Sequence, residues 1–529
     1  MATTSAIARL GAFRQTFVRA CLEGLAPVLI AVLLGWWSLR DFRGASISGA
    51  DEARHAMNGA FILDMVRNWK VEHPVEYGYW YYSHLPALSL PYHPPLFPAF
   101  EAFVFAVFGV GALGARLTVS IATAVAALLL FRLVCKTHGS RLLAFVVTAS
   151  FFTLGTVQEL SSSVMLEIPA LVFVLASLLF LAPTQDMFLG PRSLGFGILG
   201  AMAIWTKQAV FLLPLPFIYA ALGRNWKLLR RTLFWMNICV LLASALGLAI
   251  LARQLNWDGI NQSWAKTGLL QRLAHNLHFY LRSGMLGLVL GMICFVSYRL
   301  PGGRIDLRKD RLYIAWLTAV LLVLILAPAY SSRYLFFSIP ALMLLFYHGL
   351  ARLGRSLLPS SGWVIPVAVC LVSVAYSLKT SHVPYLVGPS EAATFLHNNG
   401  YRRILFCGNS NGAFIFALRS NDPSLSSTVI RGDKLPDSIY IPERLNAFIS
   451  QYGIQAVVLE RTKTGQPWDD LSPESLPFLS LQRIVPITDS TDKEDGSLSL
   501  YRVLKPSKFS HESLTVPSMV LGRDVELRF

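Results

Sequence analysis

Two adjacent carboxylates, Asp51 and Glu52, follow the first apolar segment of the chain, residues 24–38. Like charges beside each other repel, and this repulsion favours the protonated form of a carboxylate. The pair is therefore more easily explained by chemistry than by packing, since acids in such a position could act as a base or bind a metal. The structural alternative is that Asp51 is the N-cap of an amphipathic helix over residues 52–69.

Further polar residues fall at the ends of apolar segments, where a charge near membrane depth costs roughly 2.5–3.5 kcal/mol on insertion scales. We expect them to gather on the outer side of a membrane with the acid pair. The bases could hold a phosphate, and the acids could assist a base or bind Mg²⁺ or Mn²⁺ through oxygen. The set comprises His93, Arg116, Glu159, Glu167, Lys207, Arg333 and Tyr334.

Each of these residues also has a structural explanation. Arg116, Lys207 and Arg333 could extend to lipid headgroups while their stems stay in apolar surroundings. Glu167 could open a helix, because an acid favours the first turn and Pro169 follows it closely. His93 precedes two prolines and could have a purely structural role in the turn that they form.

The composition is that of an integral membrane protein. Of 529 residues, 54% are hydrophobic and 14% are charged, whereas soluble domains carry about 25% charged residues. The net charge of +16 is concentrated in short loops between apolar runs, which is the positive-inside pattern. No basic stripe with interleaved aromatic residues is present, which argues against nucleic acid as a partner. The six cysteines show neither metal-ligand spacing nor a disulfide framework.

The length and charge of the segments predict about eleven membrane crossings. Basic loops at 135–141, 224–231, 299–311 and 351–361 are expected inside, which places the C-terminal part of the chain outside. An apolar stretch at 94–109 would break this alternation, and it contains Glu101 behind two prolines. We therefore interpret it as a juxtamembrane or re-entrant helix on the outer face. The expected crossings lie near 24–38, 116–134, 142–157, 166–182, 193–206, 208–223, 232–252, 281–298, 312–328, 335–350 and 363–378.

The composition changes near residue 380, where helix and strand patterns begin to alternate. Two short helices are expected at 391–399 and 443–452, each followed by glycine, and strands at 403–407, 455–459 and 498–504. The sequence thus predicts a mainly α-helical membrane bundle over residues 1–378, with a first external loop at 41–115. An extracytoplasmic α/β domain over 379–529 follows. The glycine-containing turn at 408–412 is weakly similar to a phosphate-binding turn, although an ordinary strand-to-helix turn explains it better.

Several short motifs, in this order, resemble the polyprenol-dependent GT-C glycosyltransferases, in particular the branch of protein O-mannosyltransferases and the aminoarabinose transferase of lipid A. The order of the motifs is more telling than any one of them. They are Asp51 to His55, Tyr92 to Leu96, Gly114 to Leu117, Leu166 to Pro169, Trp205 to Lys207 and Ser332 to Leu335.

The resemblance implies a multi-spanning fold whose first external loop carries juxtamembrane helices and whose active site faces away from the cytosol. It assigns Asp51 as the base and makes Arg116 a contact to the donor phosphate. Repulsion from Glu52 would then increase the basicity of Asp51. Two positions depart from the family pattern. Glu167 stands where Asp is common, and Tyr92 stands where the aminoarabinose branch has an acid, so the pattern gives little support to a bound metal.

The sequence hypothesis is a membrane glycosyltransferase that moves a sugar from a polyprenyl-phosphate carrier to a hydroxyl on protein, lipid A or envelope glycan. Transfer would invert the anomeric carbon, and a bacterial inner membrane is the expected location. A transporter or flippase of lipid-linked sugar is the rival from another class, although no internal repeat is visible. An oligosaccharide transferase or polymerase of the same fold is a second alternative.

Overall fold

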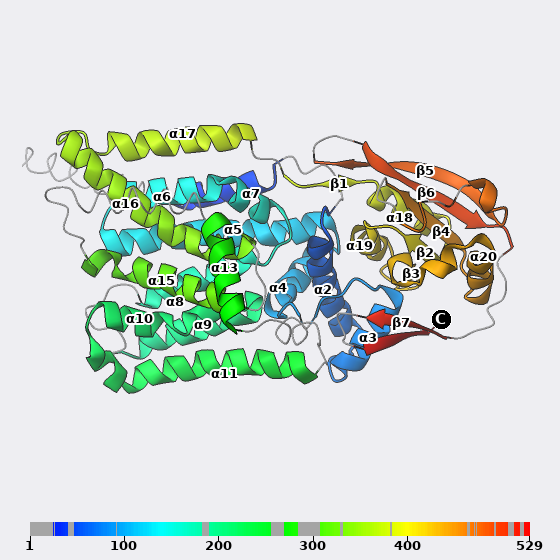
Figure 1. Ribbon diagram of the computed structural model, residues 1–529, viewed down its shortest axis with the longest axis horizontal. Helices are drawn as coiled ribbons and strands as arrows, with labels where there is room; N and C mark the ends of the chain where they lie inside the picture. The colour runs from blue at the N-terminus through cyan, green and yellow to red at the C-terminus, as the bar shows by residue number, and fades with distance from the viewer. Residues whose placement is uncertain are drawn as a thin grey trace, which may run out of the picture.

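Most of the chain is helical in the computed structural model (Figure 1). The structure describes residues 25, 27–40, 47–90, 92–181, 190–254, 269–283, 307–327, 332–380, 383–462, 466–469, 471, 473–490, 494–505, 513–518 and 523–528. The predicted crossing at 281–298 lies outside these residues from position 284, as does the first part of the basic loop at 299–311.

A bundle of roughly parallel helices forms one half of the molecule (Figure 1). Short polar connections set its helix ends: after α5, Gly139 adopts a left-handed φ of 69°, and the Ser140 side chain then caps α6 by accepting from the Leu143 amide. The bundle helices are α5 (Ala112–His138), α6 (Arg141–Thr153), α8 (Glu167–Leu181), α9 (Leu194–Lys207), α10 (Leu215–Leu222), α11 (Thr232–Gln254), α15 (Leu307–Leu326), α16 (Ile339–Leu357) and α17 (Val364–Thr380).

The structure confirms the mainly helical class and a multi-pass membrane protein. Three stretches of the described chain are long and apolar enough to cross a membrane: Ala112–His138, Thr232–Leu251 and Arg333–Leu357. A fourth is α6 together with α7 (Gly155–Ser162), which are bent by 69° relative to each other. Several shorter apolar helices accompany them, and the number of eleven crossings stays a prediction.

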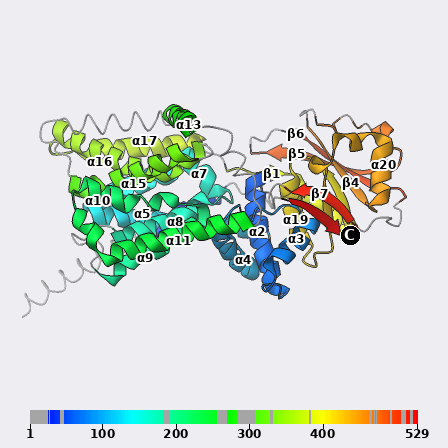
Figure 2. The same cartoon turned by 60° about the horizontal axis from the view of Figure 1, so that its bottom comes forward.

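Helices α2 (Ala50–Arg67), α3 (Pro74–His84) and α4 (Leu96–Phe108) lie between this bundle and the C-terminal region in both views (Figure 2). Helix α2 runs across the direction of the bundle helices, and the apolar helix α4 packs against it. Gly59 permits this packing, because a Cβ there would lie 2.6 Å from Cβ of Glu101. Residues 96–108 of the stretch at 94–109 thus form a helix packed on α2, and its juxtamembrane placement stays a prediction.

The C-terminal region contains a six-stranded mixed sheet in the order β1-β5-β6-β4-β2-β3. Strand β2 pairs in parallel with β3 and β4, whereas β5 and β6 pair antiparallel at the other side. The strands are β1 (Leu386–Val387), β2 (Arg403–Cys407), β3 (Thr428–Arg431), β4 (Ala456–Arg461), β5 (Leu479–Asp489) and β6 (Glu494–Val503), accompanied by α18 (Pro389–Asn398), α19 (Asn411–Asn421) and α20 (Pro442–Gln451). A separate hairpin joins β7 (Ser513–Ser518) and β8 (Arg523–Arg528).

The turn at 408–412 is already filled by a side chain. The Glu460 carboxylate on β4 accepts hydrogen bonds from the backbone amide and hydroxyl of Ser410, each at 2.8 Å. It also occupies the space that a Cβ at Gly408 would need. An internal carboxylate therefore takes the amide donors that a phosphate would use, and the ordinary strand-to-helix turn is the better description.

A buried ion pair joins the C-terminal region to α2. Arg419 on α19 holds both carboxylate oxygens of Asp64, with its Nε 2.7 Å from Oδ2, and Tyr81 donates to the same carboxylate at 2.9 Å. The side chains of Arg419 and Asp64 are 2% and 4% exposed. Bidentate pairing of this kind fixes orientation as well as distance, so α2 and α19 are locked in one arrangement.

Arg419→Met is expected to lower the free energy of unfolding by about 3–5 kcal/mol, because it leaves the Asp64 charge buried without its partner. The measurement is thermal unfolding of the purified full chain in detergent. Arg483→Met is the matched control, since Arg483 pairs with Glu391 at a site where both side chains are almost half exposed, and such pairs contribute about 0–1 kcal/mol. Equal effects of the two substitutions would contradict the anchoring role of Arg419.

Candidate active site

The first turns of α2 present acids and bases on two different faces. Residues three and four apart share a helix face, so Asp51, Arg54 and His55 lie together, whereas Glu52 points elsewhere. Asp51 is inside the helix, since the N-cap is Gly49, and the N-cap explanation of Asp51 is therefore wrong. One helix end thus supplies two carboxylates with separate surroundings.

Asp51 lies beside two arginines. Its Oδ2 accepts a hydrogen bond from Nη2 of Arg333 at 3.3 Å, and its Oδ1 lies 3.8 Å from Nη1 of Arg54. The Asp51 side chain is 41% exposed and that of Arg333 is 34% exposed. The carboxylate is therefore held by positive charge and remains open to an incoming group.

A second acid continues this arrangement. Glu167, the first residue of α8, accepts a hydrogen bond from Nζ of Lys207 at 2.6 Å, and Lys207 is the last residue of α9. Nε of Arg333 lies 3.4 Å from the same carboxylate oxygen of Glu167. Arg333 belongs to the short helix η4 (Ser332–Ser338), so four separate segments meet here. Asp51, Arg333, Glu167 and Lys207 form one connected group, which we call the acid–base cluster.

Two histidines and a tyrosine border the acid–base cluster. The rings of His55 and His93 are 4.3 Å apart edge to face, and Tyr92 packs on His93 at 4.5 Å. Burial, helped by the nearby Lys207 charge, lowers the pKa of His93 to about 3. Burial likewise lowers the pKa of His55, so both imidazoles are neutral at pH 7. Neutral rings can position polar groups without adding charge to the cluster.

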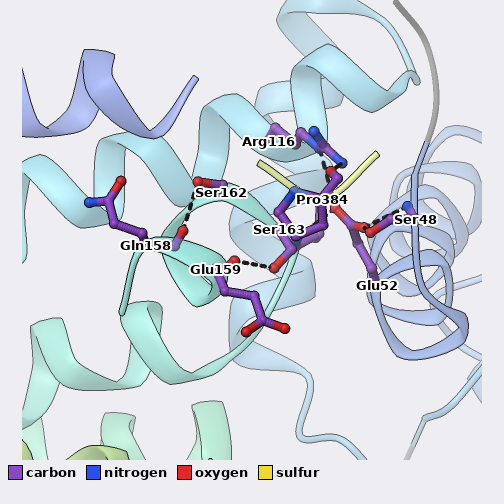
Figure 3. A network of polar contacts seen from close by, with 9 residues as sticks. Ser48, Glu52, Arg116, Gln158, Glu159, Ser162, Ser163 and Pro384 are labelled. Carbon is purple, nitrogen blue, oxygen red and sulfur yellow. Dashed lines mark hydrogen bonds and ion pairs between the residues drawn. The ribbon is translucent and has the colours of Figure 1, made fainter. Parts of the chain in front are cut away.

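Glu52 and Arg116 form a separate, buried network (Figure 3). The Arg116 Nε lies 3.3 Å from Glu52 Oε1, and the Arg116 Nη2 donates to the backbone oxygen of Pro384. Ser48 and the backbone amide of Val164 also donate to the Glu52 carboxylate. The two charged side chains are 1–2% exposed. Their contacts indicate that they position α2, and a role for Arg116 at the donor phosphate or for Glu52 in catalysis stays a prediction without support from these contacts.

The remaining predicted residues differ in their surroundings. Tyr334 adjoins Arg333 on η4 and is partly buried, beside the acid–base cluster. Glu159 on α7 is exposed, and its carboxylate forms no ion pair within the described part of the chain. Figure 3 shows its side chain directed away from Glu52 and Arg116. The structure therefore brings together Asp51, His93, Glu167, Lys207, Arg333 and Tyr334, and leaves Glu159 outside this group.

Carboxylates that could bind a metal are present in the acid–base cluster but are occupied by cations. Lys207 and Arg333 both contact the same oxygen of Glu167, and Arg333 also contacts Asp51. In the ranges that the structure describes, three residues of metal-binding type converge only at His138, Asp310 and His348. The contribution of Mg²⁺ or Mn²⁺ to the acid–base cluster stays a prediction.

Comparison with known proteins gives one family and several similar structures. Residues 92–257 match the family model described as dolichyl-phosphate-mannose-protein mannosyltransferase. The structure of ArnT from Cupriavidus metallidurans bound to undecaprenyl phosphate is similar with a TM-score of 0.58, at 14% identity, over 92% of this chain and 99% of that one. No curated protein matches the chain by sequence.

Two larger enzymes share the arrangement. The oligosaccharyltransferase of Archaeoglobus fulgidus is similar with a TM-score of 0.51, at 13% identity, over 89% of this chain and 72% of that one. The arabinofuranosyltransferase AftD from Mycobacteria is similar with a TM-score of 0.50, at 14% identity, over 93% of this chain and 40% of that one. All of these proteins are GT-C glycosyltransferases. The chain has the GT-C fold. The resemblance inferred from the sequence motifs is thereby confirmed.

This GT-C chain also contains site residues that the sequence interpretation did not assign. Arg54 and His55 lie on the Asp51 face of α2, and the spacing of three and four residues from Asp51 was the signal that could have identified them. Gln208 follows Lys207 and donates from its side chain to the backbone oxygen of Tyr92 at 2.8 Å. This bond ties the end of α9 to the loop that carries His93.

The stability of the protein is expected to fall as the pH drops from about 6.5 towards 3, partly because of His93. Its imidazole is neutral in the folded protein but binds a proton in the unfolded chain below about pH 6.5, so acid favours unfolding. Thermal midpoints of the wild type and His93→Gln between pH 7 and 4.5 test this. The variant should show a shallower pH dependence, whereas His73→Gln, at an exposed position, should retain the wild-type slope. Identical slopes for all three proteins would refute the neutral state of His93.

Proposed function

We propose that this protein is a glycosyltransferase that moves a sugar from a polyprenyl-phosphate carrier to a hydroxyl acceptor on the outer face of a bacterial inner membrane. The observation that carries the proposal is the acid–base cluster, in which a half-exposed carboxylate lies next to cations at the ends of membrane helices. The GT-C fold supports it, as does the undecaprenyl phosphate bound by the similar ArnT.

The acid–base cluster together with the adjoining Arg54 has a charge that suits a phosphate anion. Arg54, Arg333 and Lys207 outnumber the carboxylates of Asp51 and Glu167. The departing polyprenyl phosphate is an anion and needs positive charge more than it needs a proton. Prearranged cations of this kind stabilise charge that develops in the transition state. Arg333 and Lys207 are the proposed ligands of the donor phosphate, with Tyr334 beside them.

Asp51 is the proposed base. When the donor phosphate takes the guanidinium of Arg333, the carboxylate loses a hydrogen-bond partner and becomes available to the acceptor hydroxyl. Deprotonated by Asp51, that hydroxyl would attack the anomeric carbon opposite the phosphate, which inverts its configuration. A single carboxylate suffices because phosphate is a good leaving group, in contrast to glycosidases with their pair of acids.

Glu167 positions the two cations that both phosphate binding and the release of Asp51 require. Its Oε1 holds Lys207 and Arg333 at 2.6 and 3.4 Å, which fixes the two cations relative to each other. Its Oε2 is buried and has no hydrogen-bond partner among the described residues. Burying a carboxylate oxygen without a hydrogen-bond partner costs free energy, and a hydroxyl of the bound sugar would supply that partner. We therefore assign the sugar hydroxyls to this side of the site.

Asp51→Asn is expected to lower the transfer rate about 10²–10⁴-fold, because the amide cannot accept the proton of the attacking hydroxyl. The measurement is consumption of polyprenyl-phosphate-linked sugar by purified protein in detergent, with envelope lipids or glycan as acceptors. Glu72→Gln, an exposed acid beyond the end of α2, is the matched control and should keep its rate. Unchanged turnover in Asp51→Asn would remove the base assignment. A wild-type protein that moves lipid-linked sugar across vesicles and never consumes it would indicate a transporter.

Lys207→Met is expected to weaken the interaction with the donor phosphate and to lower the rate about 10²–10³-fold. Polyprenyl phosphate without sugar is the binding probe, because a ligand that binds the folded state raises the thermal midpoint. The wild type and Lys227→Met, which alters an exposed lysine of η3 (Trp226–Arg230), should be stabilised by this lipid. Lys207→Met should show little stabilisation. Equal stabilisation of the two lysine variants would exclude Lys207 as a phosphate ligand.

A further inference from the structure

A second group of ionisable side chains lies at the other end of the helical bundle. His138 is the last residue of α5, and roughly 33 Å of helix separates it from Arg116 near the start of α5. Asp310 stands in the first turn of α15, and His348 lies in α16. Neither the acid–base cluster nor the mechanism uses these three residues.

The three side chains converge on one point. Oδ1 of Asp310 lies 2.9 Å from Nδ1 of His348 and 3.1 Å from Nε2 of His138. One potential ligand atom from each residue lies within 4.8 Å of the other two. The side chains of Asp310, His138 and His348 are 0%, 2% and 11% exposed. A nearly dry set of two nitrogens and one oxygen is thus assembled from three helices.

The surroundings of His138 orient its ring for this contact. The Thr137 hydroxyl lies 2.9 Å from the backbone oxygen of Leu133, to which it donates, and 2.8 Å from Nδ1 of His138. With its proton donated to Leu133, the hydroxyl can accept from Nδ1–H of His138, and in that tautomer Nε2 carries a lone pair facing Asp310. The Tyr313 hydroxyl, also 2.8 Å from the Thr137 oxygen, completes the arrangement. Metal-binding histidines are commonly held in this way through their second nitrogen.

We propose that His138, Asp310 and His348 bind one zinc ion that links α5, α15 and α16. A divalent cation would neutralise the buried carboxylate of Asp310. It would also lie between the Asp310 oxygen and the imidazole nitrogens that face it, so that neither ring needs a proton on that nitrogen. Mixed nitrogen and oxygen ligands suit Zn²⁺, whereas Mg²⁺ and Ca²⁺ prefer oxygen alone. Zinc bonds of about 2.0–2.1 Å place tetrahedral ligands roughly 3.3 Å apart, so the contacts of Asp310 with His348 and His138, at 2.9 and 3.1 Å, need to lengthen by only a few tenths of an ångström. Water would complete the tetrahedron.

The experiment measures zinc in the purified full chain. The protein in detergent is stripped with a chelator, incubated with a small excess of Zn²⁺, desalted and analysed for metal. The wild type should retain about one zinc per chain, and its thermal midpoint should rise on loading. His348→Gln and Asp310→Asn should retain at least tenfold less. His93→Gln and His73→Gln, which alter histidines remote from this group in the chain, should bind as the wild type does.

A second measurement covers variants that fail to fold. X-ray absorption at the zinc edge of the loaded wild type should show a shell of nitrogen and oxygen ligands with two imidazoles. The absence of retained zinc in the wild type, or full retention in both His348→Gln and Asp310→Asn, would overturn the proposal. Loss of zinc in His93→Gln alone would move the metal to the acid–base cluster. None of these results depends on whether the protein transfers a sugar.

Discussion

The position of α2 depends on two buried charges that must keep their partners. Glu52 is paired with Arg116 of the helical bundle, and Asp64 is paired with Arg419 of the C-terminal region. Each pair is almost inaccessible to water, so loss of either partner would leave a charge buried at a cost of several kcal/mol. These two pairs fix one short helix between the two halves of the molecule. These pairs therefore also fix the orientation of Asp51, which precedes Glu52 in α2 and lies on the neighbouring face of this helix.

Asp51 and Glu52 look equivalent in the sequence, but they have different surroundings in the structure. Consecutive helix positions point about 100° apart, so Asp51 and Glu52 cannot share one environment. Glu52 has its charge compensated by Arg116 and by donors from Ser48 and Val164. Glu52 therefore has partners of its own, and an effect of Glu52 on the basicity of Asp51 stays a prediction. The side chains that contact Asp51 are the basic ones of Arg54 and Arg333.

The sequence allowed the elements to be predicted better than their contacts. The strand at 403–407 and the helix ends at Gly400 and Gly453 follow from local rules of burial and left-handed backbone, and the structure has them. The placement of acids and bases at segment ends was also readable, because apolar length defines those ends. The sequence did not indicate which acid forms an ion pair with which base. The pairings of Arg116 with Glu52 and of Asp64 with Arg419 depend on helix rotation and on docking between distant segments, which one sequence does not encode locally.

The C-terminal region takes part in the architecture of the acid–base cluster, although its residues lie outside that cluster. Three arginine hydrogen bonds join it to the first loop and to the start of α5: Pro384 accepts from Arg116, Arg431 donates to the backbone oxygen of Pro86, and Arg419 donates to Asp64. All three contacts use arginine, whose planar group makes several directed hydrogen bonds at once. A domain attached only by a flexible linker would need none of them. The region is thus fixed beside the loop that carries Asp51, Tyr92 and His93.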